Sequence, residues 1–352
     1  MTTLTLLHLQ HRPLRYAAGL LLSLVLAAGA SWLSTLPAVS ALGLGALTLA
    51  IVAGILAGNT FYPRFADSCD PGVVLAKQQL LRLGIVLYGF RLTFQQIADV
   101  GVSGVVIDLL TLSSTFLLAC WLGRRVFGLD RDTVWLIGAG SSICGAAAIL
   151  ATEPVIKADA SKVAVAIATV VIFGTLAIFI YPLLYPLASA LFSSVTLTSW
   201  GIFTGSTMHE VAQVVAAGHA VSPETENAAV IAKMLRVMLL APFLLLLSAR
   251  VRQQASGGSA ESATLRFPWF ALVFIAVAMA NSLHLLPVSV VNALNQLDNI
   301  VLATAMAALG LTTHISALKR AGVKPLLLGL ALFIWLVVGG GAINLGIQHL
   351  LS

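Results

Sequence analysis

The sequence predicts an all-α, polytopic membrane protein with about 11 transmembrane helices, or with nine and two re-entrant hairpins. Hydrophobic residues make up 59% of the 352 residues and charged residues only 9%, whereas a soluble domain carries roughly a quarter charged residues. The mean hydropathy of +1.00 agrees. Apolar runs of about 20 residues, long enough to cross a bilayer as helices, follow one another along the chain. These three observations exclude soluble, disordered and disulfide-scaffold proteins.

The expected elements are apolar windows whose bounds are uncertain by roughly two to four residues. They fall at about 14–35, 38–57, 72–90, 101–122, 134–152, 161–185, 200–218, 227–249, 268–286, 288–315 and 321–350. We interpret the whole chain, 1–352, as one integral membrane domain. Its consecutive parts are a first helical part at 14–122, paired broken-helix elements at 134–249, a cytoplasmic loop at 251–266 and the last three helices at 268–350.

The distribution of Lys and Arg predicts the orientation. If the N-terminus is cytoplasmic and every window spans, twelve of these residues fall in inside connections and three in outside connections. Such an asymmetry sets membrane topology. If 134–152 and 200–218 are hairpins instead, Lys157 and Lys162 move inside and the ratio becomes fourteen to one. We expect a cytoplasmic N-terminus and a C-terminus on the other side.

Other classes of ligand receive little support. The net charge is +6, but the basic residues form no cluster with interleaved aromatics, so no nucleic-acid partner is expected. The three cysteines, Cys69, Cys120 and Cys144, lack metal-ligand spacing. No cofactor and no dedicated metal site are expected, although sodium could bind at the broken elements described next.

The two weaker windows, 134–152 and 200–218, contain an internal repeat at an offset of 65 residues. Residues 140–147 align with 205–212, so a Gly-Ser-Ser step matches a Gly-Ser-Thr step. Glycines permit a helix to break inside a membrane, and hydroxyls satisfy the freed backbone groups. Secondary transporters place their sites on such broken helices near the midplane, although small residues also serve helix packing. The repetition favours a binding site.

Ionisable residues cluster beside the second break. His209 or Glu210 is expected to carry a coupling proton or to help bind an ion; the alternative is that Glu210 pairs with Lys233 or Arg236 to hold two helices together. Lys233 and Arg236 share one helix face and would attract an anion. The predicted substrate- and ion-binding set is Ser141, Ser142, Cys144, Gly145, Ser206, Thr207, His209, Glu210, Gln213, Lys233, Arg236 and Arg82.

Two further charges lie inside windows. Arg82 is too deep to reach the interface, and we place it on the pathway. Asp108 forms a stripe with Thr111 and Thr115 on one helix face, and we expect it to neutralise a neighbouring cation.

Three segments resemble the bacterial YeiH family. They are residues 65–72 (Phe-Ala-Asp-Ser-Cys-Asp-Pro-Gly), 140–145 (Gly-Ser-Ser-Ile-Cys-Gly) and 209–215 (His-Glu-Val-Ala-Gln-Val-Val), and the resemblance covers about 15–350. The family is grouped with bile acid/sodium symporters and cation/proton antiporters, and its label as sulfate exporters is itself an inference. The resemblance implies a bacterial inner-membrane protein with a periplasmic C-terminus, inverted repeats and alternating access. One strong span separates the two breaks, so an inverted repeat requires either that both are hairpins or that the true partner of 134–152 is the tenth window, 288–315.

The leading functional prediction is a secondary transporter, not an enzyme, for a small inorganic or sulfonate-type anion, with sulfate or sulfite export as the example. Its expected partners are membrane lipid, the anion and a coupling proton or sodium ion, and a homodimer is left open. A cation/proton antiporter is the alternative within the same class. An intramembrane hydrolase using Ser142 or Cys144, or a scaffolding protein, would belong to other classes.

Overall fold

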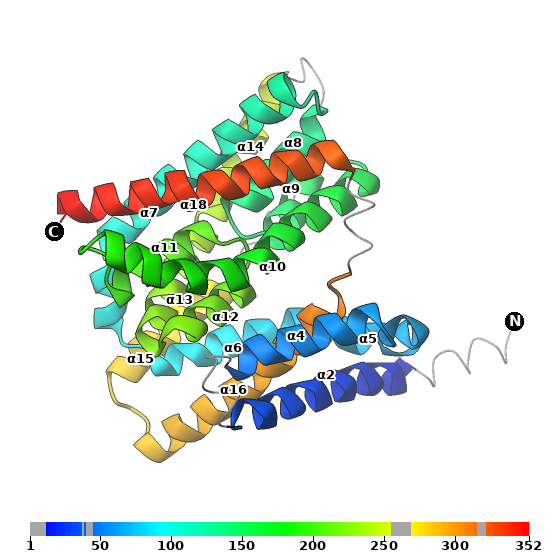
Figure 1. The fold of residues 1–352 in the computed structure, drawn as a ribbon, viewed down its shortest axis with the longest axis vertical. Helices are drawn as coiled ribbons and strands as arrows, with labels where there is room; N and C mark the ends of the chain where they lie inside the picture. The colour runs from blue at the N-terminus through cyan, green and yellow to red at the C-terminus, as the bar shows by residue number, and fades with distance from the viewer. Residues whose placement is uncertain (1–11, 37–38, 40–44, 255–268, 315–321, 352) are drawn as a thin grey trace, which may run out of the picture. The chain divides into compact units, whose positions relative to one another are not determined.

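The computed structural model describes residues 12–36, 39, 45–254, 269–314 and 322–351, and in these ranges every regular element is helical (Figure 1). Seven helical stretches are long and apolar enough to cross a membrane: Arg15–Ser34, Ala66–Arg91, Phe94–Val126, Ala160–Leu191, Pro223–Val251, Val288–Leu311 and Val323–Leu350. Four apolar helices are shorter: Ala46–Asn59, Ala146–Ile156, Val211–Val221 and Leu272–Ser282. The prediction of an all-α, polytopic membrane protein is confirmed.

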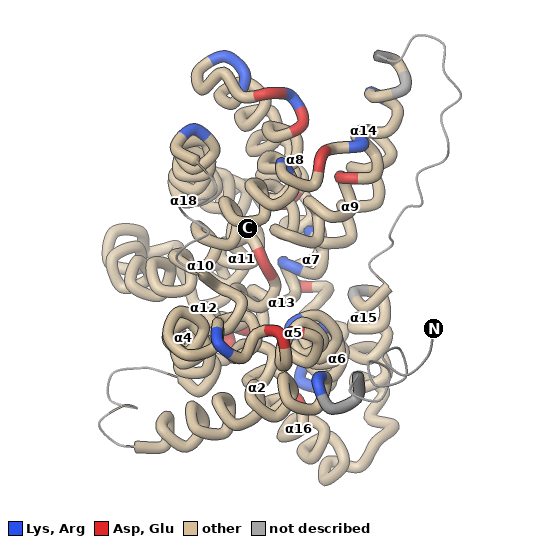
Figure 2. The backbone as a smooth tube through the Cα atoms, turned by 90° about the vertical axis from the view of Figure 1, so that its right-hand side faces the viewer, with Lys and Arg blue, Asp and Glu red and all other residues tan. Residues whose placement is uncertain are grey.

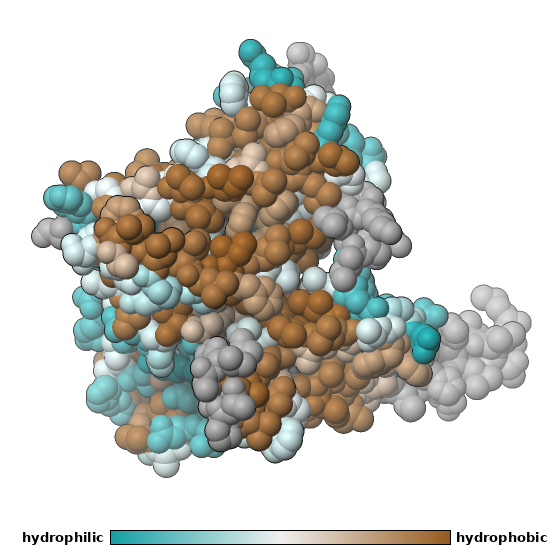
Figure 3. All heavy atoms as spheres, viewed as in Figure 1, coloured by the Kyte–Doolittle hydropathy of each residue, from teal (hydrophilic) through white to brown (hydrophobic). Residues whose placement is uncertain are grey.

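The surface has the character of a lipid-facing one. Large apolar side chains point outward on many helices; Leu183, for example, is 76% exposed. Hydrophobic residues cover much of the face shown in Figure 3. Lys, Arg, Asp and Glu are sparse along the helices in Figure 2, as a charged fraction of 9% implies. Exposed apolar surface on this scale requires acyl chains as its solvent.

The two windows with internal glycines are each broken in two. The first window holds α8 (Arg131–Ser142) and α9 (Ala146–Ile156), and the second holds α11 (Leu197–Thr207) and α12 (Val211–Val221). α11 ends 65 residues after α8, and α12 begins and ends 65 residues after α9. The helix bounds therefore follow the spacing of the sequence repeat.

Contacts between Cα atoms divide the chain into two compact units that interleave along the sequence. Unit 1 comprises 1–94 and 272–315, and unit 2 comprises 95–271 and 316–352. The consecutive parts expected from the windows divide the sequence in a different way, and they stay a prediction. The expected loop at 251–266 lies outside the described residues beyond Gln254, the last residue of α14.

Unit 1 consists of tightly packed helices. Its elements are α2 (Arg12–Ser34), α4 (Ala46–Asn59), η1 (Tyr62–Arg64), α5 (Ala66–Leu75), η2 (Ala76–Leu80), α6 (Leu81–Tyr88), η3 (Gly89–Arg91), most of α15 (Trp269–Ser282) and α16 (Val288–Leu311). α4 and α16 approach so closely that a Cβ on Gly54 would collide with the Ala307 carbonyl, and one on Gly310 with the Ile51 carbonyl. Glycine is required at both positions because the two backbones are in contact.

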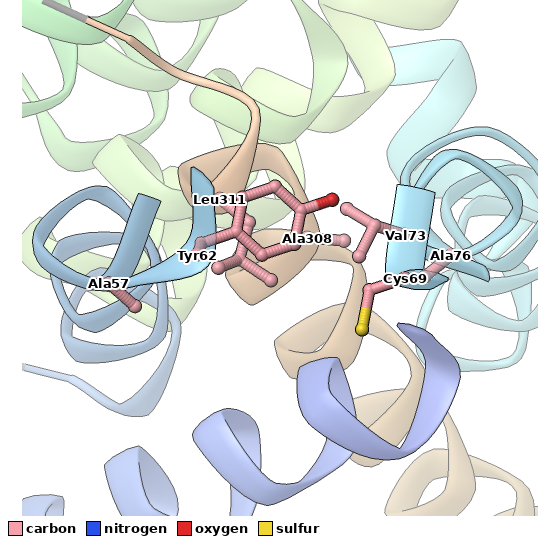
Figure 4. Packing of buried hydrophobic residues seen from close by; sticks show 7 residues of the cluster. All are labelled: Ala57, Tyr62, Cys69, Val73, Ala76, Ala308 and Leu311. Atoms are coloured by element: carbon pink, nitrogen blue, oxygen red, sulfur yellow. The ribbon is translucent and has the colours of Figure 1, made fainter. Parts of the chain in front are cut away.

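A small apolar cluster joins α4, α5 and α16 within unit 1 (Figure 4). Tyr62 lies at its centre with 1% of its surface exposed, and its hydroxyl donates a hydrogen bond to Asp70. Cys69, one of the three cysteines, also belongs to this cluster. Its thiol is therefore a packing group.

Unit 2 is arranged around the long helix α10. Its helices are α7 (Phe94–Trp121), continued by the π-helical turn η4 (Leu122–Val126), α8, α9, α10 (Ala160–Leu191), α11, α12, α13 (Pro223–Met238), α14 (Leu240–Gln254) and α18 (Val323–Leu351). At 32 residues, α10 is roughly 48 Å long. The broken elements pack along different halves of it.

The first broken element is a helical hairpin along the first half of α10. Lys162, near the start of α10, lies 2.7 Å from Asp130 and 3.1 Å from Asp132, at the start of α8. Further along, a Cβ on Gly140 would lie 2.9 Å from Val170. α9 ends only four residues before α10 begins. The outer ends of α8 and α9 therefore lie at the same end of α10.

The second broken element is a hairpin along the second half of α10, in the opposite direction. The rings of Tyr185 and Trp200 are 5.7 Å apart, and Tyr181 donates a hydrogen bond of 2.9 Å to Thr207. The outer ends of α11 and α12 meet at the start of α13, where the Thr225 hydroxyl donates to the Leu197 carbonyl at 3.0 Å. The two hairpins thus run toward each other.

Removal of the Asp130 carboxylate should weaken the first hairpin. As N-cap of α8, Asp130 accepts from the Thr133 N–H at 3.2 Å and from its hydroxyl at 2.7 Å. Burial alone would raise the pKa of Asp130, but hydrogen bonds from Lys162 and Thr133 outweigh it and lower the pKa to about 2. Asp130→Ala is expected to cost about 1 kcal/mol at neutral pH. Because the folded pKa is the lower one, this difference is complete above about pH 4 and shrinks toward pH 2.

Thermal unfolding of the purified protein over this pH range measures the effect. Asp159 is the matched control, because it is the N-cap of α10 but makes no side-chain capping hydrogen bond. Asp159→Ala should change stability by less than about 0.5 kcal/mol. Equal losses in the two variants would contradict the assigned role of Asp130.

Candidate functional site

The tips of the two hairpins meet at the centre of unit 2. The first tip is the turn Ile143–Gly145 between α8 and α9, and the second is the turn Met208–Glu210 between α11 and α12. Gly145 has a φ of +66°, which glycine adopts readily. Its missing side chain also makes room for the other tip, since a Cβ there would lie 2.6 Å from Cγ of Glu210.

Two buried cations of α13 join the tips. Lys233 donates to the carbonyls of Ile143 and Met208, both at 2.6 Å. Arg236 donates from Nε to Ser142 at 2.8 Å, from Nη2 to Ser141 at 3.2 Å and from Nη1 to the Ser206 carbonyl. Both side chains have 0% of their surface exposed. Each cation therefore bonds to both hairpins at once.

The physical reason lies in the helix ends. The last carbonyls of a helix have no partner in that helix, and together they carry partial negative charge. α8 and α11 both end at the centre of unit 2, where their last residues are buried. Lys233 and Arg236 satisfy these carbonyls and neutralise their charge. Their donor atoms are thus directed at backbone, so an anion near them would be attracted mainly by their charge.

Glu210 forms the clearest side-chain link between the tips. Its carboxylate lies 3.5 Å from the backbone N–H of Ala146, the first residue of α9, and its own N–H donates to Oε1 of Gln213 at 3.0 Å. The Glu210 carboxylate lies more than 4 Å from the side-chain nitrogens of Lys233 and Arg236. The structure therefore does not contain the alternative arrangement, a direct ion pair between Glu210 and either cation. Glu210 is partly exposed, whereas His209 beside it is 1% exposed.

Asp108 is a second carboxylate of this cluster, and it was missing from the predicted set. It has 0% exposed surface and interacts electrostatically with Arg236 and Lys233, but neither of its oxygens has a hydrogen-bond partner in the described part of the chain. Its proximity to these cations agrees with the expected neutralising role. The signal in the sequence was the polar stripe that it forms with Thr111 and Thr115.

Several other buried polar atoms of unit 2 also lack a described partner. An unsatisfied buried polar group costs roughly 1–3 kcal/mol, so a set of them is typical of a site that holds water, an ion or a substrate. They include the hydroxyls of Thr111, Thr115 and Ser141, Nδ1 of His209, Nε2 of Gln213 and the indole nitrogens of Trp200 and Trp335.

Eleven of the twelve predicted site residues lie in unit 2, on the hairpins or on α13, and Arg82 does not. Arg82 lies in α6 of unit 1 and is partly buried. Ser206 bonds to Asn344 of α18 at 3.1 Å, and Thr207 accepts from Tyr181. The sequence reading missed Tyr181 and Asn344, although Asn344 is an isolated polar residue in an apolar window.

Comparisons with known proteins agree on one family. The profile of the family described as conserved hypothetical protein 698 matches residues 18–329. The UPF0324 inner membrane protein YeiH of Escherichia coli K12 is 65% identical over 353 residues, covering 100% of both chains. YeiH of Salmonella typhi is 64% identical over 352 residues, again covering 100% of both chains. A UPF0324 membrane protein of Yersinia pestis is 66% identical over 343 residues, 96% of this chain and 94% of the relative. No solved structure matches the chain.

The bonds of Arg236 predict a large effect on stability. The Arg236 guanidinium donates to three backbone carbonyls, and in Arg236→Lys a single ammonium group replaces it. Some of these buried carbonyls then lose their hydrogen bond, and each loss is expected to lower the free energy of unfolding by about 1–3 kcal/mol. Thermal unfolding in detergent should show a marked loss for Arg236→Lys and a larger one for Arg236→Met. Arg125→Lys, at an exposed position, serves as the control. Wild-type stability of Arg236→Met would refute the role given to Arg236.

Proposed function

We propose that this chain, which belongs to the UPF0324 family of YeiH and conserved hypothetical protein 698, is a secondary active transporter of a small anion in the bacterial inner membrane. The observation that supports this most is the pair of hairpins that run toward each other along α10 and meet at Lys233 and Arg236. Transporters build their sites from such interrupted helices. The names of the relatives support the inner-membrane location.

In this proposal the hairpins re-enter the membrane from opposite sides, and their tips lie near the midplane. α10, at roughly 48 Å, is longer than the hydrocarbon core of about 30 Å, so each hairpin reaches about halfway. Nine helices then span, counting the short α4 and α15. The two hairpins then form an inverted repeat. The non-helical backbone at their tips is tolerated in the membrane because protein surrounds it.

The anion would bind where donors remain free beside positive charge. α9 and α12 begin at the tips, and their first N–H groups face the centre of unit 2 with the positive end of each helix dipole. The hydroxyl of Ser141, Nδ1 of His209 and Nε2 of Gln213 are buried donors without a described partner. Hydroxyls, N–H groups and nearby cations suit a compact oxyanion such as sulfate or sulfite, or a sulfonate.

Glu210 would couple this anion to a proton or a sodium ion. Its carboxylate lies 3.5 Å from the first N–H of α9, a position that an anionic substrate would also favour. A charged Glu210 competes with the substrate there, whereas a protonated Glu210 does not. Sodium would act on the same carboxylate together with Gln213 and the carbonyls of the tips. Either ion would change the electrostatics of the α9 N-terminus.

One observation favours a cation/proton antiporter as second candidate. Asp108 is a buried carboxylate that interacts electrostatically with the same cations, so with the partly exposed Glu210 the cluster holds two carboxylates, and paired carboxylates suit cation exchange. The hydrolase is less well supported. The Ser142 hydroxyl donates to the Ala139 carbonyl at 3.4 Å and Nδ1 of His209 has no described partner, so the two are not arranged as nucleophile and base.

Cysteine labelling tests the hairpins. In a variant lacking Cys69, Cys120 and Cys144, single cysteines replace Arg131 or Lys157 at the outer ends of the first hairpin, and Ser194 or Glu224 at those of the second. An impermeant maleimide on right-side-out and inverted vesicles should label the first pair from the cytoplasmic side and the second pair from the periplasmic side. If Arg131→Cys and Lys157→Cys are labelled from opposite sides, α8 and α9 together span and the inverted arrangement fails.

Transport is tested by uptake of radiolabelled sulfate into proteoliposomes, with sulfite and thiosulfate as competitors, under an imposed pH or sodium gradient. The effective gradient identifies the coupling ion. Glu210→Gln should lower gradient-driven accumulation on the order of tenfold, within the usual range of coupling between two ligands. Glu153→Gln, on α9 but away from the tips, is the matched control and should keep wild-type uptake.

Two results would contradict the assignment at different levels. Full uptake by Glu210→Gln under the same gradient would remove Glu210 from coupling but leave anion transport standing. No uptake by folded wild-type protein under either gradient would remove the sulfur oxyanions, and cation exchange assays would then test the second candidate.

A further inference from the structure

A hollow of about 480 Å³ lies at one end of unit 2, between α7, its π-helical extension η4, the start of α8 and α14. Phe116 of α7 and Phe243 of α14 both line it, and their ring centroids are 5.0 Å apart in an edge-to-face arrangement. The other lining residues include Leu117, Cys120, Arg124, Trp135, Leu246 and Arg250. No acidic residue is among them.

The lining is divided into an apolar part and a basic part. Leu117 and Leu246 are 67% and 73% exposed, so this wall is open to whatever surrounds the helices. Arg124 follows Leu117 by seven residues and Arg250 follows Leu246 by four, so each arginine lies at least one helical turn farther along, near the end of its helix. Both arginines interact electrostatically with Cys120. Neither guanidinium forms an ion pair with an acidic residue of the described chain.

A second hollow of about 490 Å³ continues the first around Arg124. It shares Leu117, Cys120, Arg124 and Trp135 with the first hollow and adds Trp121 and Arg125. Three arginines and two tryptophans thus surround adjoining hollows at the end of an apolar wall. Tryptophan is enriched at the level of lipid headgroups, and arginine clusters at this level bind anionic lipids.

We propose that this groove binds an anionic phospholipid, with its phosphodiester between Arg124 and Arg250 and its acyl chains along Leu117 and Leu246. The exposed leucines suit an apolar occupant, and the arginines suit a negative group, which the described chain does not place beside them. A free phosphate would satisfy only the arginines. A choline headgroup would place a second cation beside them. The lipid would connect α7 to α14. Only Leu239 separates α14 from α13, so the lipid would also stabilise the helices that carry Asp108, Lys233 and Arg236.

Native mass spectrometry and thermal unfolding of the full-length protein in detergent test the proposal, and neither depends on transport. Phosphatidylglycerol should remain bound and raise the unfolding temperature, whereas phosphatidylcholine at the same concentration should not. The double variant Arg124→Gln/Arg250→Gln should bind phosphatidylglycerol on the order of 20-fold more weakly, because each basic residue near an anionic lipid contributes roughly fivefold.

The control is the double variant Arg64→Gln/Lys157→Gln, which removes the same charge at exposed positions outside the groove and should bind as the wild type does. Leu117→Gln/Leu246→Gln should weaken lipid binding without changing charge. Equal binding by all variants would overturn the proposal. It would also be overturned if inorganic phosphate stabilised the wild type as much as phosphatidylglycerol does, because the groove would then recognise an oxyanion without chains.

Discussion

The carbonyl groups that end α8 and α11 determine much of unit 2. Both helices stop at the centre of the unit, where their last residues are buried, and the partial negative charges of the two helix ends lie close together. Lys233 and Arg236 meet both requirements with five hydrogen bonds that reach both hairpins. The breaks, the burial of two cations and the meeting of the tips therefore depend on one another.

The sequence was sufficient for the helical class, the position of both breaks and the repeat, because each has a local chemical cause. Long apolar runs predict helices in a membrane, and Gly-Ser-Ser and Gly-Ser-Thr within such runs predict interruptions. Local patterns could not decide whether a broken window crosses or turns back. That depends on contacts such as Lys162 with Asp130 and Thr225 with Leu197, which join residues about 30 positions apart.

Most of the predicted site residues lie together in unit 2, and their roles stay predictions. The cost of burying charge singled out Lys233, Arg236 and Glu210, and the structure brings them together. Depth along a helix does not reveal which neighbours a residue has, however, so the predicted set leaves out Asp108, which interacts electrostatically with both cations. The hydrogen bonds from Lys233 and Arg236 to backbone carbonyls were not predicted, because carbonyls at a helix end leave no mark in the amino-acid sequence.

Charge balance at the tips bears on how an anion could be carried. With both carboxylates ionised, the cluster holds two positive charges, on Lys233 and Arg236, and two negative charges, on Asp108 and Glu210. Adding an anion to a closed site of low dielectric is costly unless a negative charge is removed at the same time. Protonation of Glu210 would do this at the N-terminus of α9, and a sodium ion beside the carboxylate would have a similar effect. On the proposed function, coupling is thus a consequence of charge balance in a buried site, and Asp108 sets that balance although it need not touch the substrate.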